Sequence, residues 1–290
     1  MQSVPSARQA VREAIPPRGE NTWVKATASD VPGPAERDET IRATHFDNFL
    51  RMELGRLDRT IWNVVHNIAH RDTFGYKAFR FEFPEALPRF SADSERITLP
   101  ESAGEVPALV DMSRGKTVET KQMLDIVIEG EGFLTAIDSR GNNPIYTRCG
   151  RLTVNPNGCL AFPTPWLSLN EDYYSELLDP SVVVPEGTVG IQIAQKGTVW
   201  ARDASGNQTD CGAIHIVTFA KPHRLRPIDE RFFEATRDSG EPVALNIDAK
   251  AFPVIRQGFL EASNVDPDAQ KSELQRLLEQ RESLRKLITP

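Results

Sequence analysis

The sequence predicts a mainly β protein in which an antiparallel β-body is inserted between N- and C-terminal heptad helices. Three observations support this fold class. Apolar residues recur at alternating spacings of four and three in a stretch near each end of the chain. Many short apolar segments, separated by glycine, asparagine and aspartate turns, lie between those stretches. The residues that precede the first stretch are rich in proline and polar side chains.

The first heptad stretch lies in residues 43–77, which we expect to form the N-terminal helix segment. Its apolar stripe consists of Leu50, Leu54, Leu57, Ile61, Val64 and Ile68. We expect the helix itself to end near residues 70–73, because Asp72 and Gly75 are typical of turns and helix C-termini. A helix with one narrow apolar stripe needs a partner to cover it.

The second heptad stretch lies in residues 266–290, the predicted C-terminal helix. Pro267 suits a first helical turn, where its missing N–H is no loss. The apolar positions Leu274, Leu277 and Leu284 share one stripe, which Arg281 interrupts. We therefore expect the two terminal helices to pack on each other or on the helices of neighbouring subunits.

The region between the helices predicts a β-domain over residues 124–225. Strands are expected at residues 124–128, 133–137 and 145–148, and residues 213–219 form the strongest single strand candidate. The sequence Asn-Pro-Asn-Gly at 155–158 predicts the tight turn of a hairpin.

The remaining segments are assigned by composition. Residues 1–42 are expected to be a disordered N-terminal extension, because five prolines interrupt a polar sequence. Residues 78–123 are an extended connector in which prolines argue against a central strand. Residues 226–265 return the chain from the β-domain to the second helix.

Composition excludes several functions. A net charge of −7 over 290 residues argues against a broad nucleic-acid-binding face. No apolar run is long enough for a membrane span, and the N-terminus lacks the apolar core of a secretory signal. Cys149, Cys159 and Cys211 are too few for a disulfide scaffold, and whether Cys149 and Cys159 pair stays open.

Catalytic and metal-binding patterns are weak. His66 and His70 have the four-residue spacing that places two imidazoles on one helix face, but no third ligand is evident. A structural or capping role is favoured, so we expect no metal. The sequence Gly-Glu-Gly at 130–132 indicates a turn between strands. We predict no catalytic residue, no cofactor and no small-molecule substrate. A carboxylate pair for glycan hydrolysis remains an alternative, although no particular pair stands out.

Several stretches resemble the flagellar rod and hook proteins, the distal-rod members most closely. Residues 67–77 resemble a signature that begins Asn-Leu-Ala-Asn and ends Thr-Gly-Phe-Lys. Residues 111–125 and 125–133 resemble the family's DxSxG…LD and DxxIxGxGFF segments. Residues 146–160 and 217–225 resemble its YTRxGxFxxNxxGxL and ATFxNPxxL segments, and residues 256–265 resemble RQGxLExSNV. These segments follow the order found in the family.

The resemblance implies a structural axial subunit of the bacterial flagellar basal-body rod. Such a subunit self-assembles through its terminal axial helices into a helical homopolymer, contacts neighbouring rod and hook proteins, and transmits torque from motor to hook. It is exported by the flagellar type III route without a cleaved signal peptide. The seam residues would then carry assembly together with six junction residues: Asn67, Gly75, Lys77, Gly258, Phe259 and Asn264.

The chain also departs from the family pattern. His66, His70 and Arg71 stand where the family has residues that look like Asn, Asn and Val, and about 42 residues precede the first helix. These departures keep a second hypothesis open, a non-polymerising adaptor or binding module that uses the same fold.

Overall fold

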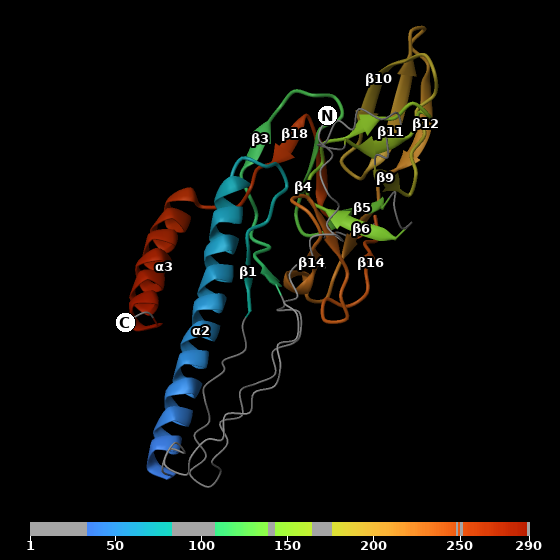
Figure 1. The fold of residues 1–290 in the computed structure, drawn as a ribbon. Helices are drawn as coiled ribbons and strands as arrows, with labels where there is room; N and C mark the ends of the chain where they lie inside the picture. The colour runs from blue at the N-terminus through green and yellow to red at the C-terminus, as the bar shows by residue number, and fades with distance from the viewer. Residues whose placement is uncertain are drawn as a thin grey trace, which may run out of the picture. The chain divides into compact units, whose positions relative to one another are not determined.

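The computed structural model describes residues 34–82, 108–138, 143–163, 176–247, 249 and 252–288. The chain divides within its first helix into two compact units, Met1–Asn48 and Phe49–Pro290. The following description concerns the second unit. Its architecture is mainly antiparallel β, with one helix before and one helix after the strands, as predicted (Figure 1). No helix among the described residues is both long and apolar enough to span a membrane.

Helix α2 (Pro34–Ala69) is longer than the sequence predicts. It ends one residue before the expected stop, and turns follow it through residue 75. Its start is a correction, because residues 34–42 are helical and do not belong to a disordered extension. Pro34 occupies the first helical position, and the glutamates, arginines and alanines that follow favour a helix. Residues 1–33 of the predicted extension lie outside the described residues.

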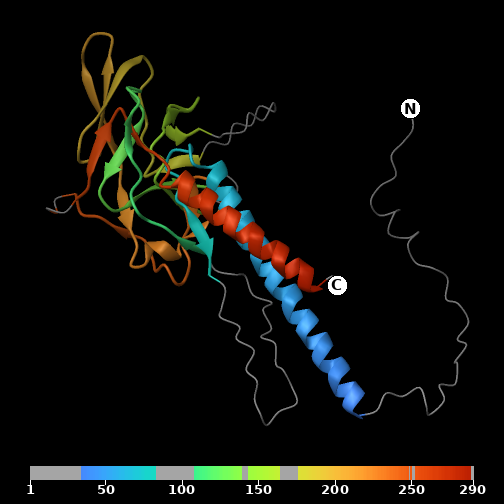
Figure 2. The same cartoon turned by 90° about the vertical axis from the view of Figure 1, so that its left-hand side faces the viewer.

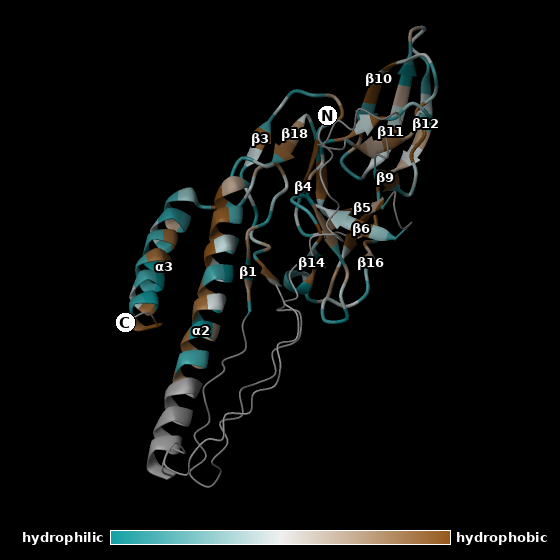
Figure 3. Cartoon of the chain, in the orientation of Figure 1, coloured by the Kyte–Doolittle hydropathy of each residue, from teal (hydrophilic) through white to brown (hydrophobic). Residues whose placement is uncertain are grey.

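Helix α3 (Pro267–Ile288) begins at the predicted proline. The Asp266 side chain caps its N-terminus by accepting hydrogen bonds from the N–H groups of Asp268 and Ala269, at 3.0 and 3.1 Å. In both views α3 runs beside α2 (Figures 1 and 2). Figure 3 shows that most of the α3 surface is hydrophilic, with only a few apolar positions.

Half of the strands among the described residues belong to one antiparallel sheet that the chain enters and leaves repeatedly. Its main path has the order β14-β15-β6-β5-β9-β8-β7, and β13 joins it by pairing with β5 and with β16. The strands are β5 (Phe133–Ile137), β6 (Pro144–Thr147), β7 (Thr153–Val154), β8 (Leu160–Phe162), β9 (Glu176–Asp179), β13 (Ile216–Thr218), β14 (Arg226–Pro227), β15 (Phe232–Glu234) and β16 (Val243–Ala244). The short 3-10 helix η1 (Pro222–Arg224) precedes β14.

Smaller sheets complete the body. A three-stranded sheet has the order β10-β11-β12, formed by β10 (Thr188–Ile193), β11 (Thr198–Asp203) and β12 (Gln208–Ala213). Three two-stranded pairs are β1 (Phe79–Phe81) with β2 (Ala108–Val110), β4 (Ile126–Glu129) with β17 (Val254–Gln257), and β3 (Thr117–Glu119) with β18 (Phe259–Glu261). Residues 83–107 of the predicted connector lie outside the described residues.

The strongest predicted strand, residues 213–219, is not one strand. Residue 213 closes β12 of the three-stranded sheet, whereas residues 216–218 form β13 of the large sheet. The chain passes from one sheet to the other at Ile214 and His215. Ile214 and Ile216 are both buried in the same apolar core. The residues on both sides of the change of sheet are therefore apolar, and in the sequence they look like one continuous strand.

The hairpin predicted around residues 155–158 is present. Strands β7 and β8 pair antiparallel, and the Asn155 side chain accepts hydrogen bonds from the N–H groups of Asn157 and Cys159. The main core lies between the sheets and includes Ile126, Leu134, Leu160, Phe162, Val199, Ile216, Phe232 and Ile255. A second apolar cluster contains Phe133, Tyr146 and Phe219, whose rings meet edge to face. This body is the support on which the helix ends are held.

Candidate functional site

The end of α2 is joined to the β-strands and to α3 by Asn67. Its amide Nδ2 donates to the carbonyl oxygen of Phe79 at 3.0 Å and to Gln270 Oε1 at 3.4 Å. Its Oδ1 accepts from the Tyr76 hydroxyl at 2.8 Å and from the N–H of Phe79 at 3.3 Å. Asn67 is 3% exposed. One buried amide therefore links the helix end, strand β1 and α3.

A buried carboxylate, Glu261 at the end of β18, binds two cations. Its Oε1 accepts from Lys77 Nζ at 2.6 Å and from the N–H of Gly115 at 3.0 Å. Its Oε2 accepts from Nη2 and Nε of Arg148, at 2.6 and 2.9 Å. The three charged side chains are between 0 and 6% exposed. Glu261 therefore connects segments that lie more than a hundred residues apart in sequence.

The two cations also donate hydrogen bonds to backbone carbonyl oxygens. Lys77 Nζ donates to the carbonyl oxygen of Ser113 at 2.6 Å. The Arg148 guanidinium donates to the carbonyl oxygens of Ile128, Gly130 and Gly132, at 2.9, 3.0 and 2.6 Å. A buried ion pair is stabilising only when its remaining hydrogen-bonding groups find partners. This cluster meets that condition through backbone oxygens from two loops.

The charges in the cluster shift one another's pKa values. Burial by itself raises the pKa of Glu261, but Arg148 and Lys77 outweigh it, and the pKa of Glu261 lies below its ordinary value. Burial lowers the pKa of Lys77, and the attraction of Glu261 offsets this only in part, because Arg148 adds a second positive charge nearby. Glu261 is therefore the ionised centre on which both cations depend.

Asn264 and Gly75 complete the junction. Asn264 Oδ1 accepts from the N–H of Ala78 at 2.8 Å, and its Nδ2 donates to the carbonyl oxygens of Asp111 and Ser113. The N–H of Gly75 donates to the carbonyl oxygen of Glu261 at 2.7 Å. The structure thus brings four predicted residues together at one place, namely Asn67, Gly75, Lys77 and Asn264.

Gly258 and Phe259 lie at a different point of the same β-ribbon. Gly258, with φ of +83°, joins β17 to β18 where the chain changes its partner strand from β4 to β3. Its N–H donates to the carbonyl oxygen of Asp125 at 2.7 Å. The Arg256 guanidinium lies 3.9 Å from the centroid of the Phe259 ring. These two residues shape the ribbon that carries Glu261 and do not touch the charge cluster.

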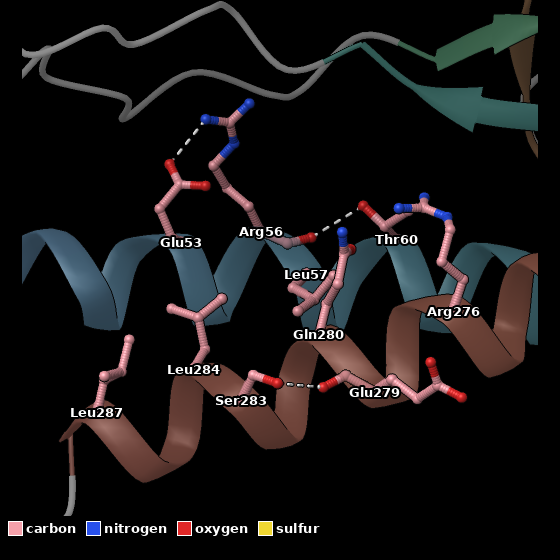
Figure 4. A pocket seen from close by; sticks show the side chains of 10 residues that line it. All are labelled: Glu53, Arg56, Leu57, Thr60, Arg276, Glu279, Gln280, Ser283, Leu284 and Leu287. Carbon is pink, nitrogen blue, oxygen red and sulfur yellow. Dashed lines mark hydrogen bonds and ion pairs between the residues drawn. The ribbon is translucent and has the colours of Figure 1, made fainter.

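Two of the predicted seam residues, Leu57 and Leu284, line the space between α2 and α3. A groove of about 600 Å³ runs between the helices, and Leu57 from α2 and Leu284 from α3 both face it (Figure 4). Arg281 Nε donates to Asp58 Oδ1 at 2.6 Å across the helix pair. Arg281, which interrupts the apolar stripe in sequence, therefore bonds the other helix.

Burial along the two stripes is uneven. Leu50, Val64 and Leu277 are buried. The other predicted stripe residues are only half-buried: Leu54, Leu57, Ile61, Ile68, Leu274 and Leu284. Large apolar side chains beside the stripes are exposed, with Trp62 at 54% and Leu287 at 66%. The helix pair within one chain therefore covers only part of its apolar surface.

Comparisons with known proteins give this arrangement a context. Residues 127–201 match the sequence model of the flagellar hook protein FlgE/F/G D1 domain. The chain is similar to the flagellar basal-body rod protein FlgG of Agrobacterium fabrum, with 29% identity over 216 residues that cover 70% of this chain and 78% of the relative. The FlgG of Bacillus subtilis gives the same identity and coverage. The FlgF rod protein of Caulobacter vibrioides is 28% identical over 255 residues, 83% of this chain and 92% of the relative. The chain is therefore similar to flagellar rod and hook proteins.

The central residues of the junction, Glu261 and Arg148, were not among the predicted sites. Glu261 and Arg148 both lie inside the motifs that carry the resemblance, at residues 256–265 and 146–160. The same two motifs also contain Arg151 and Arg256, so sequence alone does not show which charges meet.

The chain also contains reactive side chains of another kind, the thiols of its three cysteines. Cys149, Cys159 and Cys211 are free thiols, which answers the open question of a Cys149–Cys159 bond. Among the described residues, no group of three or more histidine, cysteine, aspartate or glutamate side chains is arranged to hold a metal ion. Arg71, one of the departures from the family pattern, is exposed and contacts Asp72 at 3.3 Å.

Acid is expected to weaken the Glu261 cluster over a defined pH range. In the unfolded chain a glutamate has a pKa of about 4.3. In the folded protein the pKa of Glu261 is lower than that. Between the two pKa values the unfolded state binds more protons, so stability falls as the pH falls. The contribution of Glu261 should be fully present above about pH 5 and should decline below about pH 4. Urea unfolding of the wild type and of Glu261→Gln between pH 6 and 2.5 measures it. A stability difference that stays constant over that range would contradict the prediction.

Proposed function

We propose that this protein is a structural subunit of the bacterial flagellar basal-body rod, as its FlgG and FlgF relatives are named. It assembles with copies of itself, and with neighbouring rod and hook proteins, through α2 and α3. It reaches the basal body by the flagellar type III route without a cleaved signal peptide. The proposal is of a structural protein, without an enzymatic activity.

The observation that carries the proposal is the incomplete burial of the two helices. Six of the nine predicted seam residues remain half-exposed in the single chain. Trp62, Val65, Leu278 and Leu287 are exposed beside them. Exposed apolar surface of this kind is typical of a protein interface. Contacts between different faces of successive copies do not close on themselves, so they produce a filament.

The junction supports a role in transmitting torque. A subunit that carries load needs a firm connection between its assembling helices and its β-body. Glu261, Lys77 and Arg148 provide that connection through buried, hydrogen-bonded charges. Asn67 and Asn264 add bonds to backbone atoms on both sides of the helix end. We infer that load passes from the helices to the β-body through this junction.

The double substitution of Leu57 and Ile61 by aspartate is expected to abolish rod assembly and motility. Burying an unpaired carboxylate in an apolar contact costs several kcal/mol of binding free energy. Each loss of about 1.4 kcal/mol lowers the association constant tenfold. Subunit association should therefore fall by about a hundredfold or more. Motility and electron microscopy of basal bodies measure this result, and near-UV circular dichroism checks that the β-body still folds.

The matched control is the double change Leu57→Met and Ile61→Val, which keeps the apolar surface and should still assemble. Motility in the aspartate variant would contradict the proposal. The alternative of a non-polymerising adaptor makes the opposite prediction for the wild type. An adaptor would stay monomeric at high concentration, with both terminal helices protected from proteolysis.

A further inference from the structure

Two histidines on the last turns of α2 lie side by side. The ring centroids of His66 and His70 are 4.5 Å apart. Both side chains are half-buried, so solvent reaches them. The sequence pattern alone favoured a structural role for this pair, because no third ligand was evident. The structure adds information that the spacing could not give, namely which ring nitrogen of His66 carries the proton.

The hydrogen bonds around Asn67 fix the protonation of His66. The backbone of Phe79 sets the orientation of the Asn67 amide, since its carbonyl oxygen accepts from Nδ2 and its N–H donates to Oδ1. The Tyr76 hydroxyl uses its one proton to donate to that Oδ1 at 2.8 Å. With its proton on Asn67 Oδ1, the same hydroxyl is an acceptor toward His66 Nδ1, 2.9 Å away. This arrangement corresponds to the tautomer of His66 that has the proton on Nδ1 and the lone pair on Nε2.

His70 is held in a comparable way. Its Nδ1 lies 3.2 Å from Thr73 Oγ1, which can accept a hydrogen bond. Its ring stacks on Tyr76, with centroids 5.1 Å apart and an angle of 20° between the planes. Histidine ligands to metals usually donate their second N–H to such a partner, which orients the ring and fixes the tautomer. Both imidazoles are thus positioned by hydroxyl groups on the turn after α2.

We propose that His66 and His70 form a two-histidine site for a divalent transition-metal ion, bound through both Nε2 atoms. Once both Nε2 atoms point at one ion with bonds of about 2.0–2.1 Å, ring centroids 4.5 Å apart correspond to an angle of about 90° at that ion. Adjacent ligands at a right angle suit the tetragonal geometry of Cu²⁺ or Ni²⁺ better than a tetrahedral ion. Water molecules fill the other coordination positions. Cu²⁺ binds more tightly than Ni²⁺ or Zn²⁺, in the order that nitrogen ligands generally follow.

Trp62 provides a direct readout of the site. Its ring centroid lies 5.0 Å from that of His66, and Cu²⁺ quenches tryptophan fluorescence at short range. We expect CuCl₂ added to the full chain to quench part of the emission with saturation at one ion per chain. His66→Asn and His70→Asn should each weaken binding by about tenfold or more, as loss of a metal ligand does. His223→Asn is the matched control, since this histidine lies on η1, and its titration should equal that of the wild type.

Two further variants separate binding from its readout. Trp62→Phe should lose the quenching while calorimetry still detects Cu²⁺ binding. Tyr76→Phe removes the hydroxyl that accepts from His66 Nδ1, and it should weaken binding by about tenfold, as loss of a supporting hydrogen bond does at other sites. Circular dichroism of each variant checks that the fold is retained.

The protonation of His66 offers a test that needs no metal. Nitrogen-15 NMR of the metal-free protein above pH 8 should show the proton of His66 on Nδ1. A proton on Nε2 would overturn the proposal, because that atom could not then be the ready ligand. Equal Cu²⁺ titrations of the wild type and of a His66→Asn/His70→Asn double variant would also overturn it.

Discussion

Replacing Glu261 by glutamine is expected to destabilise the protein by about 3–5 kcal/mol. The substitution keeps the shape of the side chain but leaves Lys77 and Arg148 buried without a counter-charge. Its amide also places an N–H₂ group against one of the two cations, whichever way the amide turns. Removing one partner of a buried, hydrogen-bonded ion pair leaves the other charge without compensation. The resulting loss of stability is far larger than the stability that the intact pair adds relative to apolar residues in its place. Urea unfolding at pH 7 measures the change.

A surface ion pair of similar geometry is the control for Glu261. Glu273 accepts from Nε and Nη2 of Arg276, at 2.8 and 2.6 Å, but both side chains are largely exposed. Glu273→Gln should therefore change stability much less, because water and salt screen an exposed pair. Equal losses in the two variants would show that burial of the Glu261 cluster is not what makes it important.

Replacing Gly75 by alanine is expected to destabilise the protein by at least about 3 kcal/mol, since steric strain adds to the cost of an unfavourable backbone conformation. Gly75 has φ of +75°, and an added Cβ would lie 2.3 Å from the backbone nitrogen of Cys149 and 2.5 Å from its Cα. Backbone atoms cannot move aside as the end of a flexible side chain can. The N–H of Gly75 also bonds the carbonyl oxygen of Glu261, so a shift would disturb the junction. Thermal unfolding measures the effect.

Gly187→Ala separates the two causes. Gly187 has a similar φ of +80°, but nothing lies within 4 Å of its added Cβ. This variant should lose only about 1–2 kcal/mol, the cost of a left-handed conformation for a residue with a Cβ. If Gly75→Ala proved as mild as Gly187→Ala, then the approach of Cys149 to Gly75 would not be as close as the structure has it.

The strands were predicted best where local signals agree. Strand β5 begins and ends where predicted. Its apolar run is preceded by glycines and followed by a polar turn after residue 137. The hairpin at residues 155–158 carries its turn residues within a few positions. The run 213–219 was predicted wrongly, because apolar composition does not distinguish one long strand from two segments in two sheets. Residues 34–42 were assigned to a disordered extension on the strength of nearby prolines, although their composition favours a helix.

The candidate site was predicted only in part. Asn67, Gly75, Lys77 and Asn264 came from the motifs and meet at the junction. Glu261 and Arg148, which hold that junction together, lie in the same motifs but did not stand out. Lys77 and Arg148 are 184 and 113 residues from Glu261 in sequence, and each contact depends on how the strands are paired.

The sequence by itself determined the elements whose causes are local. Heptad spacing, Pro267 and Asp266 set the helices, and glycine and asparagine turns set the hairpins, because the residues responsible lie within one or two turns of each other. Only the tertiary structure decided which charges share a buried carboxylate, which sheet each strand joins, and which hydroxyl lies next to His66 Nδ1. These outcomes depend on contacts between distant segments, where burial makes a partner necessary.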